Sequence, residues 1–86
     1  MSVILTERLV SPGKPSRQVY LINTSYSQAC EGSYELRVES SDASISHDRQ
    51  SPFLLGPREE EVLLTYLPGE RNWQGSVIDQ RCWTPR

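Results

Sequence analysis

The 86-residue chain has very little of what catalytic and metal sites are usually built from. It contains one histidine, His47, and two cysteines. No Cys-x-x-Cys or His-x3–5-His spacing is present, so a zinc site is not expected. His47 lies in a polar stretch with only Asp48 beside it as an orienting acid, and no glycine-rich elbow accompanies either cysteine. We therefore expect no enzymatic activity, no metal and no cofactor.

Long apolar runs and a basic stripe are also missing. No apolar stretch approaches the ~20 residues of a membrane-spanning helix, so membrane insertion is not expected. Positive and negative charges are interspersed and the net charge is −2, which argues against nucleic-acid binding. Residues 1–7 lack the basic flank and the apolar length of a signal peptide. We therefore expect a cytoplasmic protein, or a mature periplasmic or extracellular form from which a signal peptide was removed.

The chain is rich instead in short segments with a period of two. In residues 34–39, apolar and charged side chains alternate one for one. Such alternation is typical of a half-buried strand in an antiparallel sheet, because successive side chains point to opposite faces. The inward-facing set is Tyr34, Leu36 and Val38, and the outward-facing set is Glu35, Arg37 and Glu39.

Other segments predict the same class of structure. Apolar and β-branched residues punctuated by proline and glycine indicate strands over residues 3–10, 17–22, 33–40, 60–67 and 73–83. Two shorter strands are expected around Ile45 and at residues 53–55, within and after a loop over 41–52. The pattern predicts one domain spanning residues 1–86: an all-β, immunoglobulin-like antiparallel sandwich of about seven short strands.

Cys30 and Cys82 are the only cysteines. A bond between them would close a loop of about fifty residues and contribute roughly 4 kcal/mol to stability in the chain-entropy model. Cys30, however, falls in the polar segment 23–32, where we expect a loop. Two separate buried thiols are the alternative, and the sequence leaves both open.

Two sets of residues are candidates for contact with a partner protein. Trp and Arg are enriched in the energetically dominant positions of interfaces, so Trp83 with Arg81 predicts a contact surface, with burial of Trp83 against the sheet as the alternative. The second set is the outward face of the alternating strand, Glu35, Arg37 and Glu39.

Three segments also carry a family resemblance: Val-Tyr-Leu-Ile-Asn-Thr-Ser at 19–25, Gly-Ser-Tyr-Glu-Leu-Arg-Val at 32–38, and Ser-Pro-Phe-Leu-Leu-Gly-Pro at 51–57. They resemble bacterial immunoglobulin-like modules, and residues 32–55 are similar to the small periplasmic chaperones of curli assembly. That resemblance implies a protein that keeps an amyloid-forming fibre subunit unassembled through transient electrostatic contacts with a sandwich face. It implies Arg37, and secondarily Phe53, as contact residues.

Together these features predict a non-catalytic protein-binding module, whose partner is a fibre subunit or a component of a cell-surface or virion assembly. One alternative is a structural accessory domain of such an assembly. Another is a small cytoplasmic inhibitor, of the kind that phages encode, that uses the acidic middle third of the chain to block a host enzyme. The oligomeric state is not fixed by the sequence.

Overall fold

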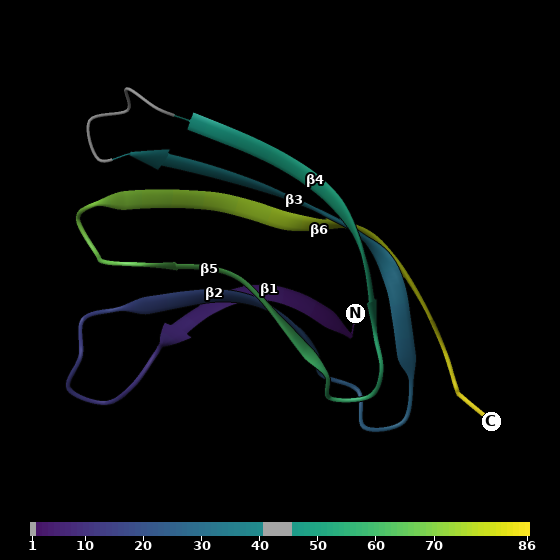
Figure 1. Cartoon of the computed structure of the whole chain (residues 1–86). Helices are drawn as coiled ribbons and strands as arrows, with labels where there is room; N and C mark the ends of the chain where they lie inside the picture. The colour runs from purple at the N-terminus through teal and green to yellow at the C-terminus, as the bar shows by residue number, and fades with distance from the viewer. Residues whose placement is uncertain (1, 41–45) are drawn as a thin grey trace.

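The computed structural model describes residues 2–40 and 46–86, which form two antiparallel three-stranded sheets and no helix. Figure 1 shows the sheets as two curved layers. One sheet has the order β1-β2-β5 and the other the order β4-β3-β6. The strands are β1 (Val3–Leu9), β2 (Arg17–Asn23), β3 (Ala29–Ser40), β4 (Ser46–Leu55), β5 (Glu60–Tyr66) and β6 (Arg71–Trp83).

The core is a single layer of side chains between the two sheets. In β2, Val19 and Leu21 point inward and are fully buried, and in β3 the inward positions Tyr34 and Leu36 are 3% and 4% exposed. Val38 packs against this layer from its edge. The alternation of residues 34–39 therefore places its apolar side chains in the core, as predicted. The other buried apolar residues are Val3, Ala29, Cys30, Phe53 and Leu55.

The strands differ from the sequence prediction in the middle of the chain. The structure describes six strands, because residues 53–55 are the end of a continuous β4 that starts at Ser46. Residues 46–52 were expected to be loop. This part of β4 is polar and its residues 48–50 are exposed, so no period of two marks it as a strand. The expected strand around Ile45 lies outside the described residues.

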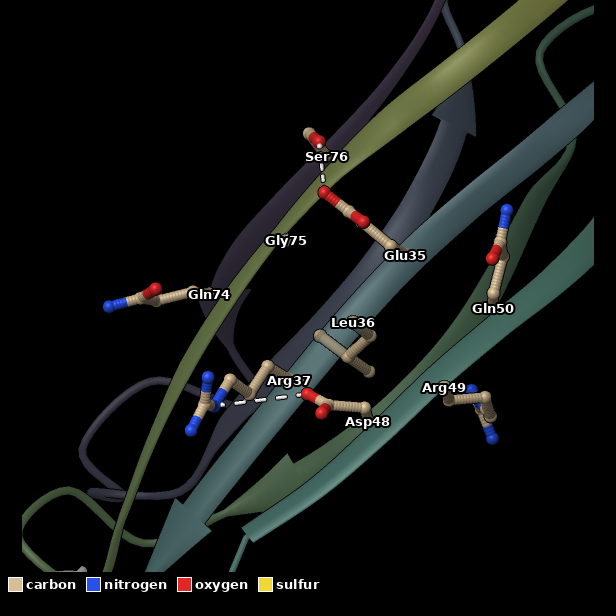
Figure 2. Close-up of a pocket in the computed structure, with 9 residues that line it drawn as sticks. All are labelled: Glu35, Leu36, Arg37, Asp48, Arg49, Gln50, Gln74, Gly75 and Ser76. Carbon is tan, nitrogen blue, oxygen red and sulfur yellow. Dashed lines mark hydrogen bonds and ion pairs between the residues drawn. The ribbon is translucent and has the colours of Figure 1, made fainter.

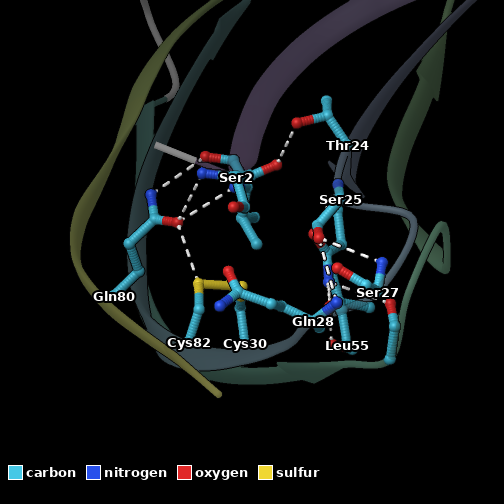
Figure 3. Close-up of a disulfide and its surroundings, with 12 residues drawn as sticks. Ser2, Thr24, Ser25, Ser27, Gln28, Cys30, Leu55, Gln80 and Cys82 are labelled. Atoms are coloured by element: carbon cyan, nitrogen blue, oxygen red, sulfur yellow. Dashed lines mark hydrogen bonds between the residues drawn. A yellow bond between two sulfur atoms is a disulfide. The ribbon is translucent and has the colours of Figure 1, made fainter. Parts of the chain in front are cut away.

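β3 also begins earlier than predicted, at Ala29, so that Cys30 lies in a strand and not in a loop. Cys30 is opposite Cys82 of β6, and the two are joined by a disulfide with Cα atoms 4.1 Å apart. Cys30 is fully buried. The bridge therefore links neighbouring strands of one sheet rather than the two sheets, as Figure 3 shows.

The fully buried side chain of Asn23 ties three chain segments together beside this disulfide. Its Nδ2 group donates hydrogen bonds to the carbonyl oxygens of Gln28, Leu55 and Gly56, at 2.7, 3.2 and 3.0 Å. Its Oδ1 accepts from the backbone N–H of Ser25. Asn23-Thr24-Ser25 has the pattern of a glycosylation acceptor, but a glycan on this buried amide is incompatible with the fold.

The disulfide predicts a large loss of stability on reduction. Opening the loop closed by Cys30 and Cys82 should lower the free energy of unfolding by about 4 kcal/mol, because the unfolded chain regains conformational freedom. Chemical denaturation of oxidised and reduced protein measures this difference. Thiol counting under denaturing, non-reducing conditions provides the control: two reactive thiols in untreated protein would contradict the bridge.

Asn23→Asp should destabilise the protein by about 3 kcal/mol, because a carboxylate would face three carbonyl oxygens without donating to them. Asn72→Asp, the same change at an exposed position of β6, is the matched control and should cost less than about 0.5 kcal/mol. Urea denaturation of both variants gives the comparison. Equal stabilities would show that the carboxamide network is dispensable.

Candidate functional site

The outer face of the β4-β3-β6 sheet carries most of the residues that the sequence nominated for partner contact. Glu35, Arg37 and Glu39 project outward from β3, the central strand. Arg81 is paired in register with Glu31 of β3, and Trp83 with Ala29. The two candidate surfaces, which sequence reasoning treated as alternatives, are thus two halves of one sheet face.

One half of this face is a polar hollow of about 700 Å³. Two cross-strand rows form its floor: Gln50, Glu35 and Ser76 in the first row, and Asp48, Arg37 and Gln74 in the second. Figure 2 shows these side chains projecting from the three strands, with Gly75 between Gln74 and Ser76 on β6. Gly75 pairs with the buried Leu36 and a side chain there would point towards Leu5 between the sheets, so Gln74 and Ser76 are the β6 side chains that face the hollow.

Arg37 is the positively charged residue around which the acidic side chains near the hollow are arranged. Its Nε lies 2.9 Å from Glu39 Oε1 and 3.8 Å from Asp48 Oδ1, and about half of its side chain remains exposed. The hydroxyl of Ser76 donates to Glu35 Oε1 at 3.4 Å. Ion pairs this exposed contribute little to stability. Their side chains can therefore be redirected to a partner at small cost.

The other half of the face is more apolar. Leu54 is 67% exposed and Trp83 is 38% exposed, and an ion pair between Arg81 and Glu31 crosses the sheet between them. A shallower hollow of about 380 Å³ adjoins this ion pair, with Pro52 in its wall. Trp83 is thus partly exposed, which lies between the two alternatives that the sequence left open, an exposed contact residue and a ring buried against the sheet.

Phe53 does not share this face. It pairs in register with Gly32, points into the core and is 6% exposed, so its ring takes part in packing. His47 lies in β4 opposite Val38, and its side chain is outside the described part of the structure.

Sequence reasoning missed two exposed apolar residues, Leu54 in the site and Ile78 elsewhere on β6. Leu54 lies between two buried residues of β4, and the sequence reads there as a short apolar run. Ile78 is 44% exposed because the register between β3 and β6 shifts at Ser33/Tyr34, which leaves Ile78 as the extra residue of a β-bulge. No periodicity marks either position, because both depend on strand pairing.

A second polar cluster joins the two sheets beside the core. Glu7 of β1 accepts hydrogen bonds at Oε2 from the hydroxyl of Tyr66 on β5 and, at 3.0 Å, from Nε1 of Trp73 on β6. Arg17 Nη1 lies 3.7 Å from Glu7 Oε1. The hydrogen bonds from Tyr66 and Trp73, with the charge of Arg17, lower the pKa of Glu7 despite its partial burial. Burial and the Glu7 carboxylate raise the pKa of Tyr66.

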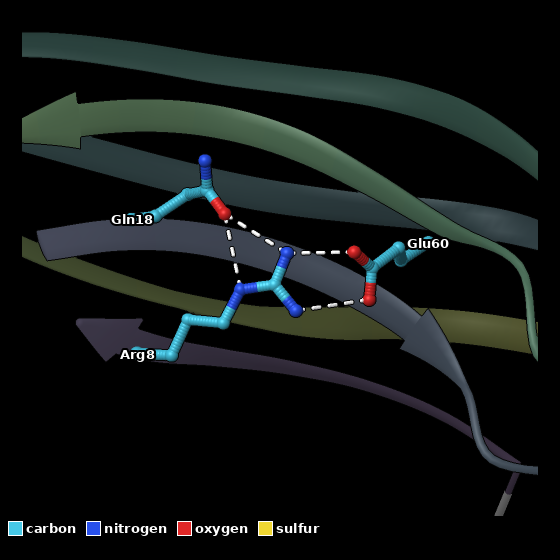
Figure 4. A network of polar contacts seen from close by, with 3 residues as sticks. All are labelled: Arg8, Gln18 and Glu60. Atoms are coloured by element: carbon cyan, nitrogen blue, oxygen red, sulfur yellow. Dashed lines mark hydrogen bonds and ion pairs between the residues drawn. The ribbon is translucent and has the colours of Figure 1, made fainter. Parts of the chain in front are cut away.

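The opposite side of the molecule carries a separate charged network, shown in Figure 4. Arg8 lies 4.1 Å over the ring of Tyr20. It donates to Gln18 Oε1 and forms a bidentate pair with Glu60. The hydrogen bonds of this pair lower the pKa of Glu60 and raise that of Arg8. The network covers the outer face of the β1-β2-β5 sheet and takes no part in the candidate site.

Within the described side chains, no group of three or more His, Cys, Asp or Glu residues converges as a metal site would require. Residues 2–40 and 46–86 also contain no helix of the length and apolarity needed to cross a membrane. Compared with known proteins, the chain matches no family model, no curated protein and no solved structure. The functional inference therefore depends on the geometry of the sheet face.

The Glu7 cluster predicts a defined pH dependence of stability. Because the folded-state pKa of Glu7 lies below the usual value of 4.5, its contribution is present above that value and is lost as the pH falls through the folded-state pKa. Glu7→Gln should cost about 1–2 kcal/mol at pH 7 and remove this part of the acid dependence. Urea denaturation between pH 2 and 7, on the order of the range over which carboxylates titrate, measures both effects.

Glu61→Gln, at an exposed position of β5, is the control for Glu7→Gln. It should leave both the stability at neutral pH and the acid dependence close to those of the unmodified protein. If Glu7→Gln and Glu61→Gln had the same acid dependence as the unmodified protein, the assignment of the effect to the inter-sheet cluster would be wrong.

Proposed function

We propose that the protein is a non-catalytic binding module that engages another protein through the outer face of its β4-β3-β6 sheet. One observation carries the proposal: Arg37 and its acidic neighbours lie on the same face as Arg81 and Trp83. The face offers apolar and aromatic anchors at one end and exposed charges at the other. Interfaces commonly combine these two elements.

The two halves of the face have different physical roles in this proposal. Burial of Leu54 and Trp83, with the arginine between them, would supply most of the binding free energy, as exposed apolar and aromatic anchors do at other interfaces. The polar hollow around Arg37 would mainly set partner choice and association rate, since exposed charges act more on steering than on affinity.

The most concrete version is a periplasmic chaperone or inhibitor of fibre-subunit assembly with an immunoglobulin-like sandwich. The sheet orders β1-β2-β5 and β4-β3-β6 support the sandwich assignment, because consecutive strands are exchanged between two facing sheets. The disulfide supports an oxidising compartment such as the periplasm or cell exterior over the cytoplasm. The same observation disfavours a cytoplasmic inhibitor and is neutral towards a structural accessory domain.

The test is the growth of amyloid by purified curli fibre subunit, followed by a fluorescent dye. Substoichiometric protein should delay growth, and Arg37→Glu should abolish the delay because it reverses the charge at the centre of the hollow. Lys14→Glu, the same kind of reversal in the exposed β1–β2 turn, is the matched control and should retain the delay. Trp83→Ala should weaken it.

Two outcomes would count against the proposal. Absence of any delay at equimolar protein removes the fibre-subunit version. Equal loss of the delay in Arg37→Glu and Lys14→Glu, with both variants folded by circular dichroism, places the interaction outside the sheet face.

A further inference from the structure

The four outer edges of the two sheets are not equally protected. β4 has Pro52 within its length, and its edge positions 48 and 49 are charged. β5 begins with two glutamates. The backbone of β1 at Val3 is occupied by the side chain of Gln80, which accepts from its N–H at 2.9 Å and donates to its carbonyl at 3.1 Å. Proline, charge and cover are the usual protections against edge-to-edge pairing.

β6 has neither proline nor charge along its middle, and β1 packs against its inner side only, where Leu5 approaches Gly75. Residues 72–78 contain no charge and no proline, and β6 is paired on one side only, with β3. Gln74, Gly75 and Ser76 are all exposed. This is the arrangement that recruits another strand through main-chain hydrogen bonds.

The register identifies which backbone groups of β6 face the open side. Cys30 and Cys82 have Cα atoms 4.1 Å apart, the separation of a non-hydrogen-bonded antiparallel pair, so the N–H and C=O of Cys82 point away from β3. Every second residue of a strand has its N–H and C=O on the same side, so the backbone groups of Gln80 also point away from β3. The extra residue at the bulge, Ile78, shifts this alternation by one, and the outward backbone groups then belong to Val77, Gly75 and Trp73.

These outward groups are complementary to a second copy of themselves. An antiparallel pairing about a two-fold axis at Gly75 places Gly75 opposite Gly75 of the second copy, and Trp73 opposite Val77 of the second copy. All are residues whose N–H and C=O face the open edge. The same pairing sets the end of β6 that carries Arg71 beside the end of the second copy that carries Asp79, beyond the bulge at Ile78, so the two ends have opposite charge and the centre has none.

We propose that two copies of the chain associate through their β6 edges into one continuous six-stranded sheet. The association is isologous, so each contact occurs twice. It extends the outer face of the sheet across the two-fold axis and brings the two polar hollows next to each other. The proposal concerns the β6 edge and does not depend on which partner binds the sheet face.

Gln74 and Ser76 provide a direct test, because both are exposed on the outer face and each lies opposite the other in the second copy. These are non-hydrogen-bonded positions, where cross-strand side chains approach most closely. In the double variant Gln74→Glu with Ser76→Glu, the glutamate at 74 of each copy lies opposite the glutamate at 76 of the other, so two pairs of like charges face each other. The matched variant Gln74→Lys with Ser76→Glu opposes unlike charges twice, with the same number of substitutions and the same new carboxylate beside Glu35.

Sedimentation velocity of the full chain over a concentration series should show a monomer–dimer equilibrium. Relative to unmodified protein, the double-glutamate variant should bind itself about tenfold more weakly, and the lysine–glutamate variant as tightly or more tightly. Gln50→Glu on the opposite edge, β4, should leave the equilibrium unchanged. Circular dichroism and thermal melting of each variant establish that the monomers are folded.

Monomer at every concentration for the unmodified protein overturns the proposal. A dimer whose dissociation constant is the same in both charge variants also overturns it, because the interface then lies elsewhere. The amyloid-growth assay is unaffected by either result, so failure of the β6 pairing and failure of the sheet-face function are separately visible.

Discussion

The buried carboxamide of Asn23 is the interaction on which the arrangement of the two sheets most depends. It lies at the end of β2 in one sheet and bonds to carbonyls at the end of β4 in the other and in the turns that lead into β3 and β5. A chain this small has a thin core. A polar group that satisfies several buried carbonyls at once therefore fixes the relative position of elements that apolar packing alone would hold loosely.

Polar contacts also hold the two sheets together on the side of the sandwich where β1 and β6 meet. Gln80 bonds to the backbone of Val3 near one end, and Glu7 bonds to Trp73 near the other. Between them, Leu5 packs against Gly75 so closely that a Cβ at residue 75 would lie 2.7 Å from its Cδ2. Glycine at this position therefore lets the two sheets approach.

The sequence predicts most of the strands but little of the site. Segments with one apolar face, such as β2 and the centre of β3, can be recognised as strands from the alternation of apolar and polar residues. β4 cannot, because a polar edge strand has no buried face over its first half. The disulfide could not be decided, since only the register that sets Cys30 opposite Cys82 brings the sulfurs together. Leu54, Ile78 and the union of two candidate surfaces likewise depend on strand pairing, which local sequence does not encode.

The position of the disulfide has a mechanical consequence. Tension applied between the two ends of the chain passes from Cys82 directly to Cys30 through the covalent bridge. Residues 31–81, which include almost all of β3, all of β4 and β5 and most of β6, are then outside the load path and cannot be extended. The segments that can yield to force are β1, β2, the connection to Cys30 and the residues after Cys82. The bridge therefore keeps the two ends of the segment from Cys30 to Cys82 at a fixed separation while the first two strands are pulled out.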